Sequence, residues 1–130
     1  MKRYYILFFL MAFISCKKQG ALPSIIILGK WEVRSLSNGW MGTQTYPPGN
    51  GNIYVFTARQ YQLYSGGNLI KQGTYTLTKK NSLLQNKVMD AIVFDNNTDA
   101  VTTLIEINGN QLSMATDAYD GNSFVYERIQ

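Results

Sequence analysis

Residues 101–116 have the sequence VTTLIEINGNQLSMAT and contain two short runs in which apolar and polar residues alternate. A period of two is the pattern of a β-strand with one buried face, not of a helix. Asn108-Gly109 lies between the runs and favours a two-residue hairpin turn, because such a turn needs positive φ at both central residues and this pair adopts it readily. The stretch therefore predicts two antiparallel strands, over 101–107 and 110–116.

The same pattern extends outward from this hairpin along most of the chain. β-branched and aromatic residues dominate each run, and turns rich in glycine, asparagine or aspartate separate the runs. No segment of ten or more residues has the apolar spacing of an amphipathic helix, and only 83–90 would admit a helical turn. Eight strands are predicted, over 30–36, 51–57, 60–65, 69–78, 87–94, 101–107, 110–116 and 122–129.

The short connections between these strands predict that sequence neighbours pair antiparallel. Eight such strands can form an open sheet, a sandwich or a closed barrel, and closure is favoured because it removes both exposed edges. The interior of an eight-stranded barrel is either filled by side chains or holds one small ligand. We therefore expect an all-β fold, a single eight-stranded antiparallel up-and-down β-barrel over residues 25–130.

The first fifteen residues have the order of a secretory signal. Lys2 and Arg3 precede an apolar run over 4–14, and the small residue Ser15 follows. The run is shorter than the roughly 20 apolar residues that cross a bilayer. Residues 1–15 are therefore expected to be a cleaved signal peptide.

Phe13-Ile14-Ser15-Cys16 resembles a bacterial lipobox, although Phe13 stands where leucine is usual. The resemblance implies that Cys16 is acylated, for example with palmitate, and becomes the N-terminus of the mature chain. An ordinary secretory signal that leaves a thiol behind is the alternative. The polar residues 16–24 are then a lipidated N-terminus and flexible tether, and the membrane is a partner through acylated Cys16.

Composition excludes several classes of partner and chemistry. Cys16 is the only cysteine, so the mature domain has no internal disulfide. Without Lys2 and Arg3, the twelve basic residues fall to ten against eight acidic ones, and they are scattered along the chain. No basic stripe interleaved with aromatic residues is present, so nucleic acid is not an expected partner.

A catalytic role is not expected. The chain has no histidine, which excludes Ser-His-Asp and Cys-His arrangements and histidine-bearing metal sites. Alternation sends most carboxylates outward from a strand, and four of them lie singly in different predicted strands, namely Glu32, Asp90, Glu106 and Glu127. We therefore expect no enzyme, no catalytic residues and no cofactor.

Asp95 to Asp99, followed by Glu106, fits the spacing of a calcium-binding loop. Ala100 stands where that loop requires glycine, and predicted strands rather than helices flank the segment. A solvated hairpin turn is therefore expected and no metal site, with weak calcium affinity at this turn left open.

Gly29-Lys30-Trp31 in the first strand and Arg128 in the last resemble the closing elements of a lipocalin barrel. In that family the tryptophan closes the barrel floor and the arginine stacks on it, so the resemblance gives Gly29, Trp31 and Arg128 structural roles. The whole set is similar to the lipocalin-like domain of small lipoproteins of the Bacteroidetes type, through four further motifs: Tyr54 to Thr57, Gly73 to Tyr75, Asn108 to Leu112 and Tyr126 to Arg128. It implies an exported protein in the outer membrane.

The strands carry many aromatic residues, and the longest irregular segment, 37–52, joins the first two strands where lipocalins carry a lid over the barrel mouth. Loops of this length are usually functional or disordered. Its Trp40 either takes part in recognition or simply plugs the barrel. The candidate ligand-binding residues are Trp40, Tyr46, Tyr54, Phe56 and Tyr75.

Two hypotheses for the function follow. The first is a monomeric, membrane-anchored module that binds a small apolar or amphipathic ligand by burial. The second is a filled barrel that contacts another envelope protein, as an accessory subunit or inhibitor. An open lumen lined by Tyr54 or Phe56 and Tyr75 favours the first, whereas a filled lumen with an exposed aromatic loop favours the second.

Overall fold

The computed structural model describes residues 26–130; the expected signal peptide, the lipid attachment at Cys16 and the tether lie outside the described residues. No helix in the described part is long and apolar enough to cross a membrane. The nine strands are β1 (Gly29–Asn38), β2 (Gly42–Thr45), β3 (Ile53–Phe56), β4 (Gln60–Ser65), β5 (Asn68–Asn81), β6 (Val88–Phe94), β7 (Thr103–Asn108), β8 (Gln111–Thr116) and β9 (Ser123–Arg128).

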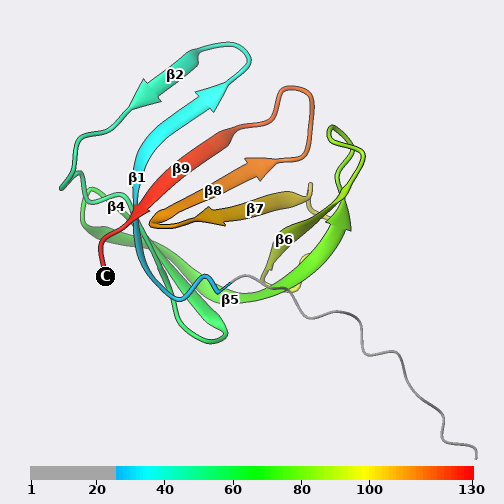
Figure 1. The fold of residues 1–130 in the computed structure, drawn as a ribbon. Coiled ribbons are helices and arrows are strands. Elements are labelled where there is room, and N and C mark those ends of the chain that lie inside the picture. The colour runs from blue at the N-terminus through cyan, green and yellow to red at the C-terminus, as the bar shows by residue number, and fades with distance from the viewer. Residues whose placement is uncertain (1–25) are drawn as a thin grey trace, which may run out of the picture.

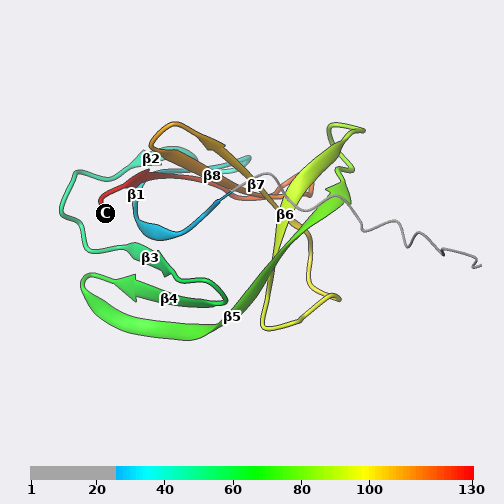
Figure 2. The same cartoon turned by 60° about the horizontal axis from the view of Figure 1, so that its bottom comes forward.

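Eight of these strands close into an antiparallel barrel (Figures 1 and 2). Each strand from β3 to β8 pairs with the next in sequence, and β1 pairs with β3 on one side and with β9 on the other. The last strand thereby returns to the first, from Trp31 opposite Arg128 to Ser37 opposite Ser123. The predicted eight-stranded all-β barrel is confirmed, because each predicted strand overlaps a strand of the structure.

The prediction that 37–52 is irregular is wrong in part. This segment contains β2, which pairs only with the far end of β1, from Ser35 opposite Thr45 to Asn38 opposite Gly42. All four residues of β2 are exposed, so they have no buried face and no apolar alternation that would reveal the strand in the sequence. The backbone pairing is supplemented by one hydrogen bond between the hydroxyls of Ser37 and Thr43, at 2.8 Å.

The hairpin between β7 and β8 differs from the prediction by one residue. Asn108 pairs with Gln111, so the central residues of the turn are Gly109 and Asn110 rather than Asn108 and Gly109. Positive φ occurs at Gly109 alone, which is the pattern of a II′ turn. Two positive-φ residues in succession occur instead between β4 and β5, at Gly66 and Gly67, and directly after β6, at Asp95 and Asn96.

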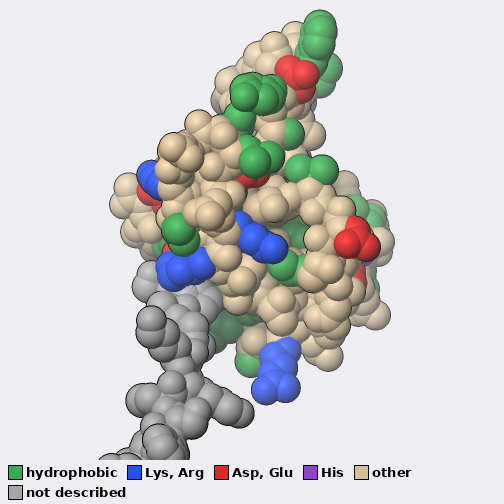
Figure 3. Space-filling view, turned by 90° about the vertical axis from the view of Figure 1, so that its right-hand side faces the viewer, with side chains coloured by type: hydrophobic (Ala, Val, Ile, Leu, Met, Phe, Trp, Pro, Cys, Tyr) green, Lys and Arg blue, Asp and Glu red, His purple; other side chains and the backbone are tan. Residues whose placement is uncertain are grey.

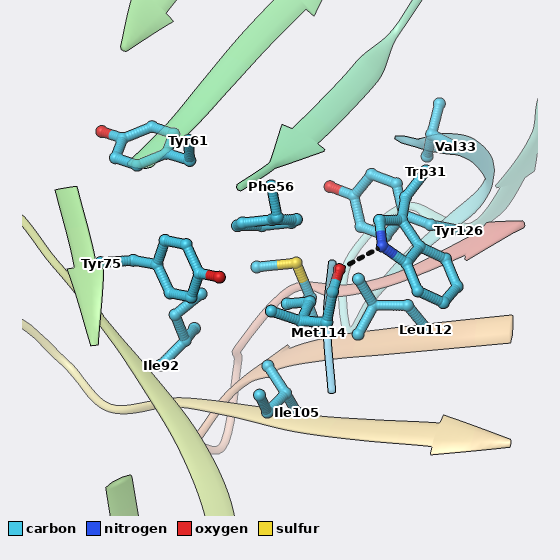
Figure 4. Packing of buried hydrophobic residues seen from close by; sticks show 11 residues of the cluster. Trp31, Val33, Phe56, Tyr61, Tyr75, Ile92, Ile105, Leu112, Met114 and Tyr126 are labelled. Carbon is cyan, nitrogen blue, oxygen red and sulfur yellow. Dashed lines mark hydrogen bonds between the residues drawn. The ribbon is translucent and has the colours of Figure 1, made fainter. Parts of the chain in front are cut away.

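One end of the barrel is closed by Trp31, whose side chain is wholly buried. Its indole N–H donates to the carbonyl of Ile27 at 2.7 Å (Figure 4). The guanidinium of Arg128 lies over the ring, 4.1 Å from its centroid, and donates to the carbonyl of Leu28 at 2.5 Å. Gly29 has φ of 123°, and a Cβ there would lie 2.6 Å from the carbonyl oxygen of Gln130. The resemblance to lipocalins implies structural roles for these same three residues.

The half of the barrel next to Trp31 is filled by side chains (Figure 4). Leu112 and Tyr61 are almost entirely buried, and Phe56 meets Tyr75 edge to face with ring centroids 5.1 Å apart. Such interlocked aromatic and aliphatic groups leave little room for a ligand at this depth. Any open space must therefore lie toward the other end.

The junction of β6 and β7 is the shortest in the barrel, with two paired positions, Ala91 opposite Leu104 and Ile92 opposite Thr103. At one end of this seam the buried carboxylate of Asp117 accepts hydrogen bonds from the Ser82 hydroxyl (3.0 Å) and the Leu83 amide (2.7 Å). These bonds link the β5–β6 turn, which is not helical, to the connection between β8 and β9.

We predict that Arg128→Met lowers the free energy of unfolding by about 1–3 kcal/mol. The change keeps an apolar stem but removes the cation over Trp31 and the hydrogen bond to the Leu28 carbonyl. Chemical denaturation followed by circular dichroism measures the loss. Lys30→Met, an exposed change on the adjacent strand, is the control, and equal stability of the two variants would contradict the structural role of Arg128.

Candidate ligand-binding site

The open end of the barrel contains a cavity of about 480 Å³. This volume falls within the range of small-molecule sites. A smaller hollow of about 250 Å³ lies along the β6–β7 connection and is bordered by Lys71, Lys80 and Asp95. The barrel cavity is lined by Val33, Tyr46, Asn52, Tyr54, Leu63, Tyr64, Ser65, Ile70, Phe94, Thr103, Met114, Thr116, Phe124 and Tyr126.

Three tyrosines of this lining, Tyr46, Tyr54 and Tyr126, have hydroxyls that donate to no other group of residues 26–130. The rings of Tyr54 and Tyr126 meet at 71° with centroids 5.7 Å apart. Burial raises the pKa of both, and the proximity of Tyr54 and Tyr46 raises the pKa of Tyr126 further. No protein group within residues 26–130 accepts a hydrogen bond from these three hydroxyls, and none of them is a fully buried unpaired atom. They therefore offer donors and acceptors to a molecule in the cavity.

The lining contains no charged side chain. Its remaining polar groups are the Asn52 amide and the hydroxyls of Tyr64, Ser65, Thr103 and Thr116. A charged ligand that entered would lose its hydration without an opposite charge to offset the loss. The site consequently suits an uncharged molecule that combines apolar surface with a few hydrogen-bonding atoms.

The five predicted ligand-binding residues separate into three groups. Tyr46 and Tyr54 line the cavity. Phe56 and Tyr75 belong to the filled half, where the Tyr75 hydroxyl donates to the carbonyl of Thr57 at 2.5 Å. Trp40 is 84% exposed at the tip of the β1–β2 hairpin, so it neither lines the cavity nor plugs the barrel.

Sequence reasoning did not select the other aromatic groups of the lining, although Phe94, Phe124 and Tyr126 are recognisable as strand aromatics. Alternation along a strand indicates which side chains face inward. It does not indicate how far along the barrel each one lies, because that depends on the stagger between strands. Core and cavity residues differ in their position along the barrel axis, and alternation in the sequence does not indicate that position.

The loop that bears Tyr46 and Asn52 is held against the barrel by Glu32. This residue lies on the outer face of β1 between inward Trp31 and Val33, yet it is only 3% exposed. Its carboxylate accepts hydrogen bonds from the amides of Gly49 (3.0 Å) and Gly51 (3.2 Å).

Arg34 holds the Glu32 carboxylate in place beneath the loop. Its guanidinium donates to Glu32 at 2.6 Å and to Glu127 on β9 at 2.7 Å. Burial by itself would raise the pKa of Glu32, but the bonds from Arg34, Gly49 and Gly51 together hold that pKa below its ordinary value. A charged group in the first strand thus fixes the wall of the cavity from outside.

Asp95, the first acid of the calcium-like spacing, is turned toward the barrel wall. Its carboxylate accepts hydrogen bonds from the Tyr61 hydroxyl (2.9 Å) and the Thr74 amide (3.0 Å). Burial, and then this carboxylate, raise the pKa of Tyr61 to about 12. A Cβ on Gly73 would lie 1.9 Å from the carboxylate oxygen, so glycine is required beneath Asp95. The contacts of Asp95 therefore explain the glycine of the Gly73-Thr74-Tyr75 motif.

Comparisons with protein-family models, with curated proteins and with solved structures found no match. The resemblance to lipocalin-like lipoproteins therefore remains an expectation from the sequence, and the geometry of the site is the basis for its interpretation.

We predict that Glu32→Gln weakens the pH dependence of stability in acid. Because the folded pKa of Glu32 lies below its ordinary 4.5, its ionised form stabilises the barrel above about pH 4.5. That stabilisation is lost as the pH falls through the lowered pKa. Denaturation midpoints from pH 7 to pH 3 measure the effect.

Glu106→Gln is the matched control for this experiment, because Glu106 is an exposed carboxylate on β7. It should leave the acid slope of the wild type nearly unchanged. Identical slopes for the wild type and Glu32→Gln would show that the ion pair does not hold the loop.

Proposed function

We propose that the protein is a membrane-anchored, lipocalin-like lipoprotein that holds one small uncharged amphipathic molecule in the mouth of its barrel, by burial rather than by catalysis. The observation that carries the proposal is the cavity of about 480 Å³, which is lined by no charged side chain and by four tyrosines, three of whose hydroxyls donate to no protein group within residues 26–130. The anchor is acylated Cys16, with the outer membrane as the expected location.

The division of the barrel into a filled and an open half supports binding over a purely structural role. Trp31, Leu112 and Tyr61 already supply a well-packed core in the closed half. A ring of tyrosines in the other half contributes less to stability than aliphatic residues that fill the space would, because their hydroxyls require partners. Ligand atoms that pair with these hydroxyls account for the residue types present.

The chemistry of the lining also limits the ligand. Tyr54 stacks near Phe94, with centroids 6.0 Å apart and ring planes within 17°, so the wall is flat and aromatic. Flat or extended apolar groups fit such a wall, and hydroxyl, carbonyl or ether oxygens fit the tyrosines. The filled-barrel alternative has less support, since the filling stops at the closed half.

The proposal can be tested with N-phenyl-1-naphthylamine, an uncharged aromatic probe whose fluorescence rises in apolar surroundings. The barrel closes entirely within residues 26–130, so an unlipidated chain of residues 17–130 is a suitable sample. We predict saturable binding of one probe per chain, and weaker binding of the anionic analogue 8-anilinonaphthalene-1-sulfonate, because no cation lines the cavity.

Two variants locate the binding. Thr116→Phe places a ring in the cavity and should abolish binding, whereas Thr98→Phe, in the exposed β6–β7 connection, should preserve it. Native mass spectrometry after incubation with a lipid and metabolite extract of the host then identifies the ligand class. Probe binding that survives Thr116→Phe, or a preference for the anionic analogue, would contradict the proposed site.

A further inference from the structure

Three neighbouring loops carry strongly exposed apolar side chains. Trp40 (84% exposed) and Met41 (75%) form the tip of the β1–β2 hairpin, and Tyr119 (93%) lies in the β8–β9 connection. Leu83 (80%) and Leu84 (46%) lie in the turn between β5 and β6. These five residues are called the apolar rim. Exposed apolar residues that gather in one place commonly mark an interaction site.

The rim loops lie side by side at the open end of the barrel. Since Ser37 pairs with Ser123, the two loops that follow and precede them are adjacent, and a Cβ on Gly39 would lie 3.6 Å from the Asp120 carboxylate. Asp117 ties the β8–β9 connection to the amides of Leu83 and Leu84. Figure 3 shows hydrophobic side chains at the projecting top of the molecule, next to an acidic one, and others below.

Electrostatics do not select a charged partner for this rim. Residues 35–58, which include the paired part of the β1–β2 hairpin from Ser35 to Thr45, contain no charged side chain. In the other two rim loops the exposed charges are Lys87 and Asp120, which are opposite in sign. Nucleic acids and highly charged proteins are therefore poor candidates.

We propose that the apolar rim inserts into the headgroup region of a zwitterionic lipid bilayer. Tryptophan and tyrosine concentrate at membrane interfaces because their rings are amphipathic. The rim consists of separate projections rather than a flat face. A stable protein interface needs about 800 Å² of complementary surface on each partner, whereas lipids rearrange around projecting loops. A bilayer fits these loops better than a protein surface does.

The start of the described chain agrees with this orientation, an argument that rests on the proposed lipid anchor. Ile26 borders a surface hollow together with Lys87 and Val88, next to the turn that carries Leu83 and Leu84. The ten residues from Cys16 to Ile26 span at most ~35 Å when extended. A lipid on Cys16 and the rim can therefore occupy the same membrane.

This orientation has a consequence for the cavity. Thr103 and Thr116 line it and lie directly next to the rim, because Asp117 follows Thr116 and its amide donates to the carbonyl of Thr102. The mouth then faces the bilayer, so an amphipathic ligand exchanges with the membrane without crossing water.

The test uses the unlipidated chain of residues 17–130 with phosphatidylcholine vesicles. Trp31 is wholly buried and Trp40 is exposed, so a change in tryptophan fluorescence on addition of vesicles arises at Trp40. We expect a blue shift, quenching by lipids brominated on their acyl chains, and little sensitivity to salt. In vesicle flotation, Trp40→Ser should lower partitioning about tenfold, as expected for the loss of one buried large apolar group.

Ile129→Ser is the matched control, because Ile129 is an exposed apolar residue at the closed end and should not affect flotation. Absence of a shift and of flotation, or binding that needs anionic lipids and disappears in salt, would overturn the proposal. Retention by envelope proteins without vesicle binding would do the same. Trp40→Ser should still bind the naphthylamine probe, because Trp40 does not line the cavity. Loss of vesicle binding with probe binding intact therefore separates the membrane proposal from the proposed ligand site.

Discussion

The return of the last strand to the first is the constraint on which the structure depends. Pairing of β1 with β9 removes both edges of the sheet and fixes which side chains face the interior. Trp31 and Arg128 lie opposite each other across this pairing, so the residues that close the sheet also seal its end. The packed core lies at the end that Trp31 closes, and the cavity lies at the opposite end.

Alternation in the sequence was sufficient to predict the eight barrel strands, whereas the places of Trp31 and Arg128 were implied only by the resemblance to lipocalins. It was insufficient wherever the outcome depends on pairing register. β2 is a strand without a buried face, and the β7–β8 turn is centred one residue later than its Asn-Gly pair suggests. Glu32 points outward as alternation requires, yet a loop that is distant from it in the sequence covers it.

Register also explains why the candidate site was predicted only in part. Tyr54 and Phe56 are two residues apart on one strand and both point inward, but Tyr54 borders the cavity and Phe56 the packed core. Two residues along a strand amount to roughly 7 Å, which is enough to move a ring from one environment to the other. A prediction that gives only the inward or outward direction of a side chain therefore finds the inward aromatic residues. It does not separate those that line the cavity from those that belong to the packed core.

The short seam between β6 and β7 gives the barrel an uneven resistance to opening. Two paired positions hold this junction, whereas seven hold β5 to β6. Opening free energies vary across a protein, and the segments with the fewest hydrogen bonds exchange their amide protons through small local excursions. The amides of β6 that face β7 should therefore exchange with solvent while the rest of the wall stays protected. At one end of this weakly paired junction, the Asp117 carboxylate joins the β5–β6 turn to the β8–β9 connection, so local opening there also requires the loss of these hydrogen bonds.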